Sequence, residues 1–345
     1  MNLAGRDYFL LFSISLLLVG TLTPVMKNVA IRYGVVDQPG ESHKTHRIPI
    51  PYLGGLAIAI GVVVVSYGSL IFSGVASSDY LRASSILLPG IFLSIVGLID
   101  DILKLSPWPR FLAQNVVGLI SAFILISTKT LGKPTGSLFL DILITVLWIV
   151  GLTNAINFFD NIDGGASGSV AISTLVISIL ALQSNQYLIA AQAVVIAGAT
   201  IGFLIWNRPP ARIYMGDAGS LFLGLMIASL TIRLDPNPIN QMASFAVPLF
   251  LVAVPIMDTS VVVIKRIIRG ISPFQGGTDH LSHRLMRSGL SKKQAVFSLW
   301  LLSAFFALLA FLLSNSPYRW EGEIATLGSV AWLIFFVLFS RQQDS

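Results

Sequence analysis

Long apolar segments recur along this chain, and they limit what it can fold into. Hydrophobic residues make up 54% of the sequence and charged residues only 11%. Many segments reach or approach the roughly 20 residues that an α-helix needs to cross a bilayer. The sequence therefore predicts an all-α, polytopic integral membrane protein, with residues 1–345 forming a single membrane domain. The eleven predicted spans cover residues 8–26, 53–73, 85–99, 111–128, 138–156, 168–182, 188–206, 218–232, 243–264, 295–314 and 325–340.

The loops between these spans differ in charge, which predicts how the chain is oriented. With eleven spans, the two termini lie on opposite sides of the membrane. The loops and tail on one side hold sixteen Lys and Arg residues, and those on the other side hold six. Because cytoplasmic loops carry the excess of Lys and Arg, we place the C-terminus in the cytoplasm and the N-terminus outside. The polar clusters that suggest chemistry all fall on the cytoplasmic side, which predicts an active site facing the cytoplasm and built from loops 27–52, 100–110, 154–168, 207–217 and 265–294.

Composition narrows the chemistry that such a site can use. The chain has no cysteine, which excludes thiol nucleophiles, thiolate metal sites and disulfide bonds. In a soluble protein the net charge of +6 would suggest a nucleic-acid partner, but here the excess lies in loops and is explained by membrane topology. We therefore expect a lipid bilayer as the environment, no nucleic acid as a partner, and chemistry carried by carboxylates, amides, histidines and cations.

Two adjacent acids close the third predicted span. Asp100 and Asp101 stand in the sequence GLIDDILKL, with Lys104 one turn later. Neighbouring residues of a helix point about 100° apart, so the two carboxylates cannot both face one partner if the helix continues. We expect different roles for them, with Lys104 pairing with either acid or reaching a phosphate. The alternative is a solvated helix end that carries an ordinary ion pair.

Four polar residues follow one another at three-residue intervals near the end of the fifth predicted span. Asn154, Asn157, Asp160 and Asp163 form a stripe of hard oxygen ligands and amide donors. Such groups suit Mg²⁺ and a nucleotide diphosphate. The alternative is a stripe that only hydrogen-bonds neighbouring helices. The glycines that follow do not form a dinucleotide fingerprint, because they enter a membrane helix without a preceding strand.

The segment between the seventh and eighth predicted spans carries one acid. Asp217 lies between two glycines at the start of the eighth span, and Asn207 opens the segment. An N-cap aspartate is a common structural role at such a place. As the only acid of that loop, Asp217 is our first choice for a metal ligand.

Histidines are concentrated in two basic loops. His280 and His283, with Arg284 beside them, lie in the most basic loop of the chain, and two further histidines precede the second span. Zinc usually needs a third or fourth protein ligand, which no cysteine or HExxH motif supplies. A cradle in which the histidines and Arg284 bind phosphate oxygens fits better. Lys44 and His46 in the first cytoplasmic loop are predicted substrate-binding residues.

Asp258 is the acid whose role the sequence leaves open. It lies inside the ninth predicted span, where it is either a buried partner for another helix or part of the same pocket.

Taken together, these motifs resemble a known family. The segments GLIDD, NAINFFDNIDG, NRPPARIYMGDAGSLFLG, PIMD and HLSHRL, with KTHRIPIPYLGG before them, are similar to those of the MraY/WecA-type polyprenyl-phosphate N-acetylhexosamine-1-phosphate transferases. The resemblance implies a multi-pass enzyme of the bacterial plasma membrane with ten or eleven helices, and Mg²⁺, or alternatively Mn²⁺, as its cofactor. It also implies transfer of a sugar-1-phosphate from a UDP-sugar to undecaprenyl phosphate, with release of UMP.

The resemblance also implies roles for individual residues. Asp100 and Asp101 become the paired acids tied to the lipid phosphate, and Asp217 becomes the main Mg²⁺ ligand, with Asn157 as a second. Ser282 stands where many members have histidine, which favours the branch that uses simple sugars such as N-acetylglucosamine. Residues expected around the nucleotide sugar are Lys104, Asn154, Asp160, Asp163, Asn207, His280, His283 and Arg284.

The expected mechanism is direct attack by the lipid phosphate, because phosphoryl transfer depends mainly on positioning and charge neutralisation. Asp100 or Asp101 would orient or deprotonate that phosphate. One alternative keeps the reaction and changes the donor to UDP-MurNAc-pentapeptide or a modified amino sugar. An alternative of another class is a cation-coupled transporter. The sequence leaves the oligomeric state open, with a homodimer as one candidate.

Overall fold

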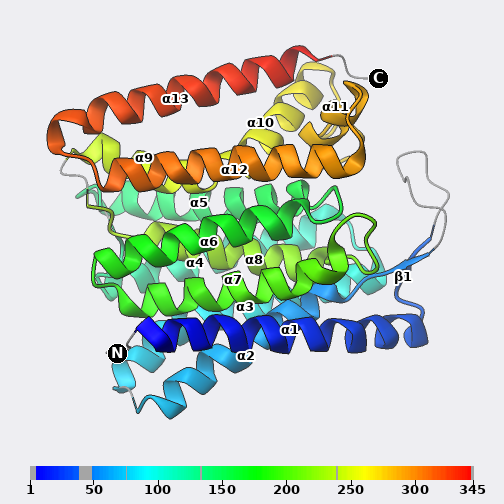
Figure 1. Cartoon of the computed structure of the whole chain (residues 1–345), viewed down its shortest axis with the longest axis horizontal. Coiled ribbons are helices and arrows are strands. Elements are labelled where there is room, and N and C mark those ends of the chain that lie inside the picture. Colours follow the sequence, from blue (N-terminus) through cyan, green and yellow to red (C-terminus); the bar gives the residue numbers. More distant parts are fainter. Residues whose placement is uncertain (1–4, 39–48, 75, 133, 238–239, 343–345) are drawn as a thin grey trace.

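Helices make up nearly all of the computed structural model, which describes residues 5–38, 49–74, 76–132, 134–237 and 240–342 (Figure 1). Lys44 and His46 lie outside the described residues. The helices are Gly5–Tyr33 (α1), Gly54–Phe72 (α2), Ser77–Leu103 (α3), Pro107–Ser127 (α4), Leu138–Phe159 (α5), Gly165–Gln183 (α6), Tyr187–Asn207 (α7), Gly216–Arg233 (α8), Gln241–Leu251 (α9), Ala253–Ile268 (α10), Leu281–Arg287 (α11), Lys292–Ser314 (α12) and Tyr318–Arg341 (α13). Two short strands, Val36–Asp37 (β1) and Ile50–Pro51 (β2), pair antiparallel.

The membrane architecture predicted from hydropathy is confirmed, with a smaller count of long apolar helices. Within the described residues, nine helices are long and apolar enough to cross a bilayer, and the pair α9–α10 makes a tenth if it is one broken span. The predicted span that is missing from this count is the eighth, residues 218–232, which falls on α8; this helix has only 18 residues and carries Asp217 and Arg233 near its two ends. Large apolar side chains such as Phe9, Leu17 and Phe72 are exposed on the surface, as expected for side chains that face lipid.

The ninth predicted span, residues 243–264, is a bent pair rather than one straight helix. Helices α9 and α10 meet at an angle of 81°. Val252 leaves the helical conformation between them, with φ of −122°. Pro255 contributes to the break, because its ring clashes with the carbonyl four residues earlier and it has no N–H to donate. The bend sends α10 toward the polar end of the bundle.

Helix α8 is the centre of the bundle. Its residues from Ala218 to Thr231 are all buried, and it packs against α3, α5 and α2. A Cβ atom added to Gly97 of α3 would lie only 2.3 Å from the carbonyl oxygen of Asp217. Glycine therefore allows the last turns of α3 to lie directly against the first turn of α8. This contact brings the Asp100–Asp101 pair next to Asp217.

The polar segments gather at one end of the bundle, at the right in Figure 1. There the segment before α8 pairs with the segment before α2: Tyr214 N–H donates to Pro51 O at 2.8 Å, and Gly54 N–H donates to Tyr214 O at 3.0 Å. Helix α1 begins at the opposite end of the bundle from the end of α13 (Figure 1). Which side of the membrane each terminus faces stays a prediction from the loop charges.

Candidate active site

A cavity of about 600 Å³ opens among these polar segments. Its lining comes from β1, α3, α4, α5, α7, α8, α10, α11 and α12 and from the loops between them. Most residues singled out from the sequence contribute to this lining. They are Asp100, Asp101, Lys104, Asn157, Asp160, Asp163, Asn207, Asp217, His280 and His283.

Asp217 and Asp100 share one cation, Arg110 of α4. The guanidinium of Arg110 donates to Asp100 Oδ2 at 2.9 Å and also to Asp217 Oδ2. The other oxygen of Asp217 accepts from Asn157 Nδ2 at 2.9 Å, and the same amide donates to Ser220 Oγ at 2.8 Å. Two neighbouring helices, α4 and α5, therefore fix the Asp217 side chain with its carboxylate toward the cavity. Asp217 is not the N-cap residue of α8, because Met215 holds that position.

Asp101 has different partners from Asp100, as the helical geometry predicts. Its Oδ1 accepts from Asp217 N at 2.9 Å and its Oδ2 accepts from Ala218 N at 3.1 Å. These are backbone donors that the first turn of α8 cannot satisfy internally. Asp101 therefore caps α8 from the neighbouring helix, and its contacts support a role in holding Asp217 rather than in touching a substrate.

Lys104 lies at the C-cap of α3 and turns away from the helical path with φ of 50°. Lys104 was predicted to pair with Asp100 or Asp101 or to reach a phosphate. In the structure Asp100 pairs with Arg110, and Lys104 lines the cavity.

The predicted polar stripe is divided within α5, between Asn154 and Asn157. Asn157, Asp160 and Asp163 line the cavity, whereas Asn154 does not. Asn154 Nδ2 instead donates to Gln114 Oε1 at 2.5 Å and to Val150 O at 2.8 Å, so its contacts connect α5 with α4. The expectation of a substrate contact at Asn154 is therefore corrected to a helix-packing role. Asn154 lies one turn before Asn157 and farther from the cavity end of α5, where its amide meets Gln114 of α4 instead of the cavity.

Asp160 and Asp163 both lie in the turn between α5 and α6. Burial raises the pKa of the Asp160 carboxyl well above its usual range, and the Asp217 and Asp101 charges raise it further. Asp163 is paired with Lys292 at 2.7 Å and also accepts from Ala211 N at 2.9 Å. These four acids concentrate negative charge on one wall of the cavity.

Asn207 holds the loops around the cavity together. It is buried, its Oδ1 accepts from Gly164 N at 2.9 Å, and its Nδ2 donates to Ile213 O at 3.0 Å. Its amide thus connects the turn after α5 with the segment before α8.

The histidines lie on the opposite wall, at the start of α11. His280 bonds Asp258 through Nδ1 at 2.7 Å. Burial, together with the neighbouring His280 and Arg287, lowers the pKa of His283 to about 4, so His283 is neutral near pH 7. The cradle therefore contains a neutral imidazole at position 283.

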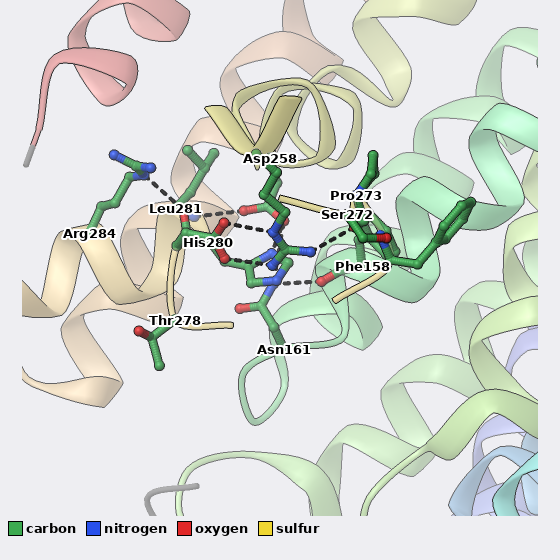
Figure 2. Close-up of polar contacts among 12 residues, drawn as sticks. Phe158, Asn161, Asp258, Ser272, Pro273, Thr278, His280, Leu281 and Arg284 are labelled. Atoms are coloured by element: carbon green, nitrogen blue, oxygen red, sulfur yellow. Dashed lines mark hydrogen bonds and ion pairs between the residues drawn. The ribbon is translucent and has the colours of Figure 1, made fainter. Parts of the chain in front are cut away.

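Arg284 does not take the place that the sequence suggested. It is almost fully buried, at 1% exposed, and does not line the cavity. Its guanidinium donates to the carbonyl oxygens of Asp279, Phe339 and Gln342, at 2.8, 3.2 and 2.7 Å. The predicted phosphate contact at Arg284 is thus corrected: the side chain satisfies carbonyls at the end of α13, because it points away from His280 and into the packing between α11 and α13 (Figure 2).

Known proteins share these features. A family model described as glycosyl transferase family 4 matches residues 83–235, which include Asp100, Asp101, Asn157 and Asp217. A probable undecaprenyl-phosphate N-acetylglucosaminyl 1-phosphate transferase from Bacillus subtilis is 36% identical over 336 residues, covering 95% of this chain and 87% of the relative. The chain belongs to glycosyl transferase family 4. The resemblance drawn from the motifs is thereby confirmed.

Two other relatives of this family 4 protein differ in the substrates that their names give. A decaprenyl-phosphate N-acetylglucosaminephosphotransferase from Mycolicibacterium smegmatis is 30% identical and covers 90% of this chain and 82% of the relative. A phospho-N-acetylmuramoyl-pentapeptide-transferase from Streptococcus thermophilus is also 30% identical, over 81% of this chain and 87% of the relative. Membership in a transferase family favours an enzyme over the cation-coupled transporter.

The acidic wall of this family 4 protein has the donor chemistry that a divalent cation prefers. Carboxylate and amide oxygens suit Mg²⁺. Within the described residues, no three His, Asp or Glu side chains are grouped closely enough to hold a metal, and Arg110 lies between Asp100 and Asp217. However, Asp100 Oδ1 is buried with no hydrogen-bond partner, which is costly for a carboxylate oxygen. The donor set of Asp100, Asp217 and Asn157 therefore fits a bound cation.

The sequence reasoning missed several residues that line the cavity of the transferase. Arg110 is the clearest, since it was counted only as a basic loop residue. The sequence could have indicated Arg110, because it is the second basic residue of loop 100–110 and follows Lys104 in the same loop as the two acids. The remaining missed polar residues are Asp37, Tyr52, Asn161, Tyr214, Arg266, Gln275 and Lys292.

Proposed function

We propose that this protein transfers an N-acetylhexosamine-1-phosphate, namely N-acetylglucosamine-1-phosphate, from a UDP-sugar to undecaprenyl phosphate. The observation that carries the proposal is the cavity in which Asp100, Asp217 and Arg110 form one contact network opposite His280. Such a site matches phosphoryl transfer, which needs aligned phosphates and neutralised charge more than a covalent intermediate. The names of the relatives support the lipid acceptor and the amino sugar.

The reaction is a single displacement. An oxygen of the lipid phosphate attacks the sugar-linked phosphorus of the UDP-sugar, a new P–O bond forms, and the bond from that phosphorus to the bridging oxygen breaks. UMP leaves with the bonding electron pair. Because the second pKa of a phosphate monoester is near 6, the attacking phosphate is already largely dianionic at neutral pH and needs no strong base.

Residues of this chain supply the positioning. Asp100 orients the lipid phosphate, and Asp101 holds the first turn of α8 in place. Asp217 and Asn157 would hold Mg²⁺, for which Mn²⁺ is the alternative, and when bound the ion supplies charge neutralisation along the diphosphate. Lys104 and His280 face the cavity and bind phosphate oxygens of the nucleotide.

The site faces the cytoplasm of a bacterial cell. The excess of Lys and Arg lies in loops at the cavity end of the bundle, and cytoplasmic loops carry that excess. UDP-sugar would enter from the cytoplasm, and undecaprenyl phosphate would enter from the plasma membrane. A homodimer stays a prediction.

The proposed sugar is N-acetylglucosamine because the relative with the higher identity, 36%, carries that sugar in its name, whereas the muramoyl-pentapeptide relative is 30% identical. Ser282 points the same way, because its hydroxyl contacts Asn161 inside the protein where many family members have a histidine.

The deciding experiment measures UMP release by the purified protein with undecaprenyl phosphate and a panel of UDP-sugars. We expect release with UDP-N-acetylglucosamine, formation of the lipid-linked sugar phosphate by mass spectrometry, and loss of both when Mg²⁺ is chelated. If UMP were released only with UDP-MurNAc-pentapeptide or with a modified amino sugar, that compound would replace UDP-N-acetylglucosamine as the proposed donor. If none of the donors in the panel gave UMP release, the proposal would be refuted.

Asp217→Ala tests the site within the same assay. We expect it to abolish UMP release, while the variant still inserts into the membrane and purifies as the wild type does. As a matched control, Asp141→Ala removes a buried acid of α5 that accepts from Thr135 at the other end of that helix, and turnover should stay near wild type.

A further inference from the structure

Asp258, the acid whose role the sequence left open, is the centre of a buried hydrogen-bond network. Its side chain is fully buried in α10. It accepts from His280 Nδ1 at 2.7 Å, from Leu281 N at 2.6 Å and from Asn161 Nδ2 at 3.4 Å. Figure 2 shows Asp258 pointing from α10 toward the start of α11 and toward Asn161. One carboxylate thus joins three segments that are far apart in the sequence.

The network closes on itself through Asn161. The hydroxyl of Ser282 donates to Asn161 Oδ1, and Asn161 Nδ2 also donates to Phe158 O at 2.8 Å. His280 and Ser282 therefore reach the same carboxylate, one directly and the other through the amide. The ring of Phe158 packs edge-on against that of His280, with centroids 6.3 Å apart. These contacts leave the His280 ring little freedom to rotate.

This geometry determines which ring nitrogen of His280 faces the cavity. A carboxylate that already accepts N–H groups from Leu281 and Asn161 acts as an acceptor toward the ring as well, so Nδ1 carries a proton. This proton is assigned from the hydrogen bond to Asp258. His280 lines the cavity, which leaves Nε2 as the nitrogen directed at whatever binds there.

We propose that Asp258 is a positioning residue of the transferase, which holds the His280 ring so that an Nε2–H group donates to a phosphate oxygen of the nucleotide sugar. The proposal rests on the proposed function and deepens it. Asp258 itself touches no substrate, because it is buried behind His280. Groups that orient a functional histidine through its second nitrogen commonly matter by 10-fold to 100-fold.

A double-mutant cycle tests this role, with kcat and KM for UMP release as the readout. We expect Asp258→Asn and His280→Gln each to lower kcat/KM by about 100-fold, as a small misplacement of a catalytic contact does. The double variant should be no worse than His280→Gln alone, because Asp258 acts only through that ring. Losses that multiply, or normal turnover in Asp258→Asn, would overturn the proposal.

Asp141→Asn is the matched control, since it also neutralises a buried aspartate and keeps its shape, but at the far end of α5. Its turnover should be near wild type. Thermal unfolding and size-exclusion profiles of all variants separate loss of positioning from loss of folding.

A second measurement needs neither activity nor a folded Asp258 variant. The chain has four histidines, so ¹⁵N-histidine NMR of the wild-type protein resolves them, with His280→Gln supplying the assignment. We expect a protonated, hydrogen-bonded Nδ1 at His280, and an unprotonated Nδ1 would refute the inference. If the wild type released no UMP, the proposed function would fail, while the orientation of His280 would still be decided by this spectrum.

Discussion

The carboxylate of Asp101 accepts the backbone N–H of Asp217 at 2.9 Å, across 116 positions of sequence. The last turn of α3 thereby caps the first turn of α8 and fixes the backbone from which the Asp217 side chain enters the cavity. Asp100, one residue earlier, bonds Arg110 instead. The two neighbouring aspartates therefore contact different partners, because a helix turns about 100° from one residue to the next.

This division predicts different phenotypes for the two acids. Asp101→Ala should destabilise the folded protein by about 2 kcal/mol, because it leaves two backbone donors without their acceptor. Asp100→Asn should lower kcat by about 100-fold while thermal unfolding stays near that of the wild type. Unfolding curves and UMP release measured side by side check both. The same stability loss in both variants would contradict the division.

Arg110 is predicted to hold together two acids that would otherwise repel each other. Without its guanidinium, Asp100 and Asp217 would keep their charges close together and partly buried. Arg110→Ala should therefore unfold at lower temperature than wild type when divalent cations are chelated. Added Mg²⁺ should raise the unfolding temperature of the variant more than that of the wild type, because the cation replaces the lost charge. An equal Mg²⁺ effect in both proteins would speak against this account.

Gly97 is predicted to be irreplaceable for a steric reason. A Cβ at this position would meet the Asp217 carbonyl oxygen at 2.3 Å, so α3 and α8 must separate in Gly97→Ala. We expect a loss of about 1–3 kcal/mol of stability, typical of overpacking, together with reduced turnover. Gly151→Ala in α5 is the control, because a Cβ there has no heavy atom within 4 Å. If both variants behaved alike, close packing at Gly97 would not be the cause.

The lowered pKa of His283 predicts an acid-dependent loss of stability. Burial and the neighbouring His280 bring that pKa to about 4, against about 6.5 in an unfolded chain. Between pH 4 and pH 6.5, the unfolded state binds a proton at His283 that the folded state does not bind. The folded state therefore keeps its full stability above pH 6.5 and loses stability as the pH falls toward 4. The fall in unfolding temperature from pH 7 to pH 5 should therefore be smaller in His283→Gln than in the wild type. An identical fall in both proteins would contradict the prediction.

Prediction from the sequence worked best for features that depend only on neighbouring residues of the chain. The apolar spans follow from the thickness of a bilayer, and every predicted span coincides with helix in the structure. It failed where a side chain depends on partners distant in the chain. Asn154 and Arg284 belong to polar clusters by spacing, yet their amide and guanidinium groups bond Gln114 and the end of α13. The 81° bend between α9 and α10 was likewise hidden inside a continuous apolar run.

The sequence by itself determined the membrane class, the residue types available for chemistry, and the family to which the motifs belong. Only the tertiary structure decided that Asp101 caps α8, that Arg110 joins Asp100 to Asp217, and that Asp258 orients His280. The physical reason is that hydropathy and helical spacing act along the chain, whereas these hydrogen bonds depend on how separate helices pack. Asp217 and Arg110 are 107 positions apart, and no local pattern records that they meet.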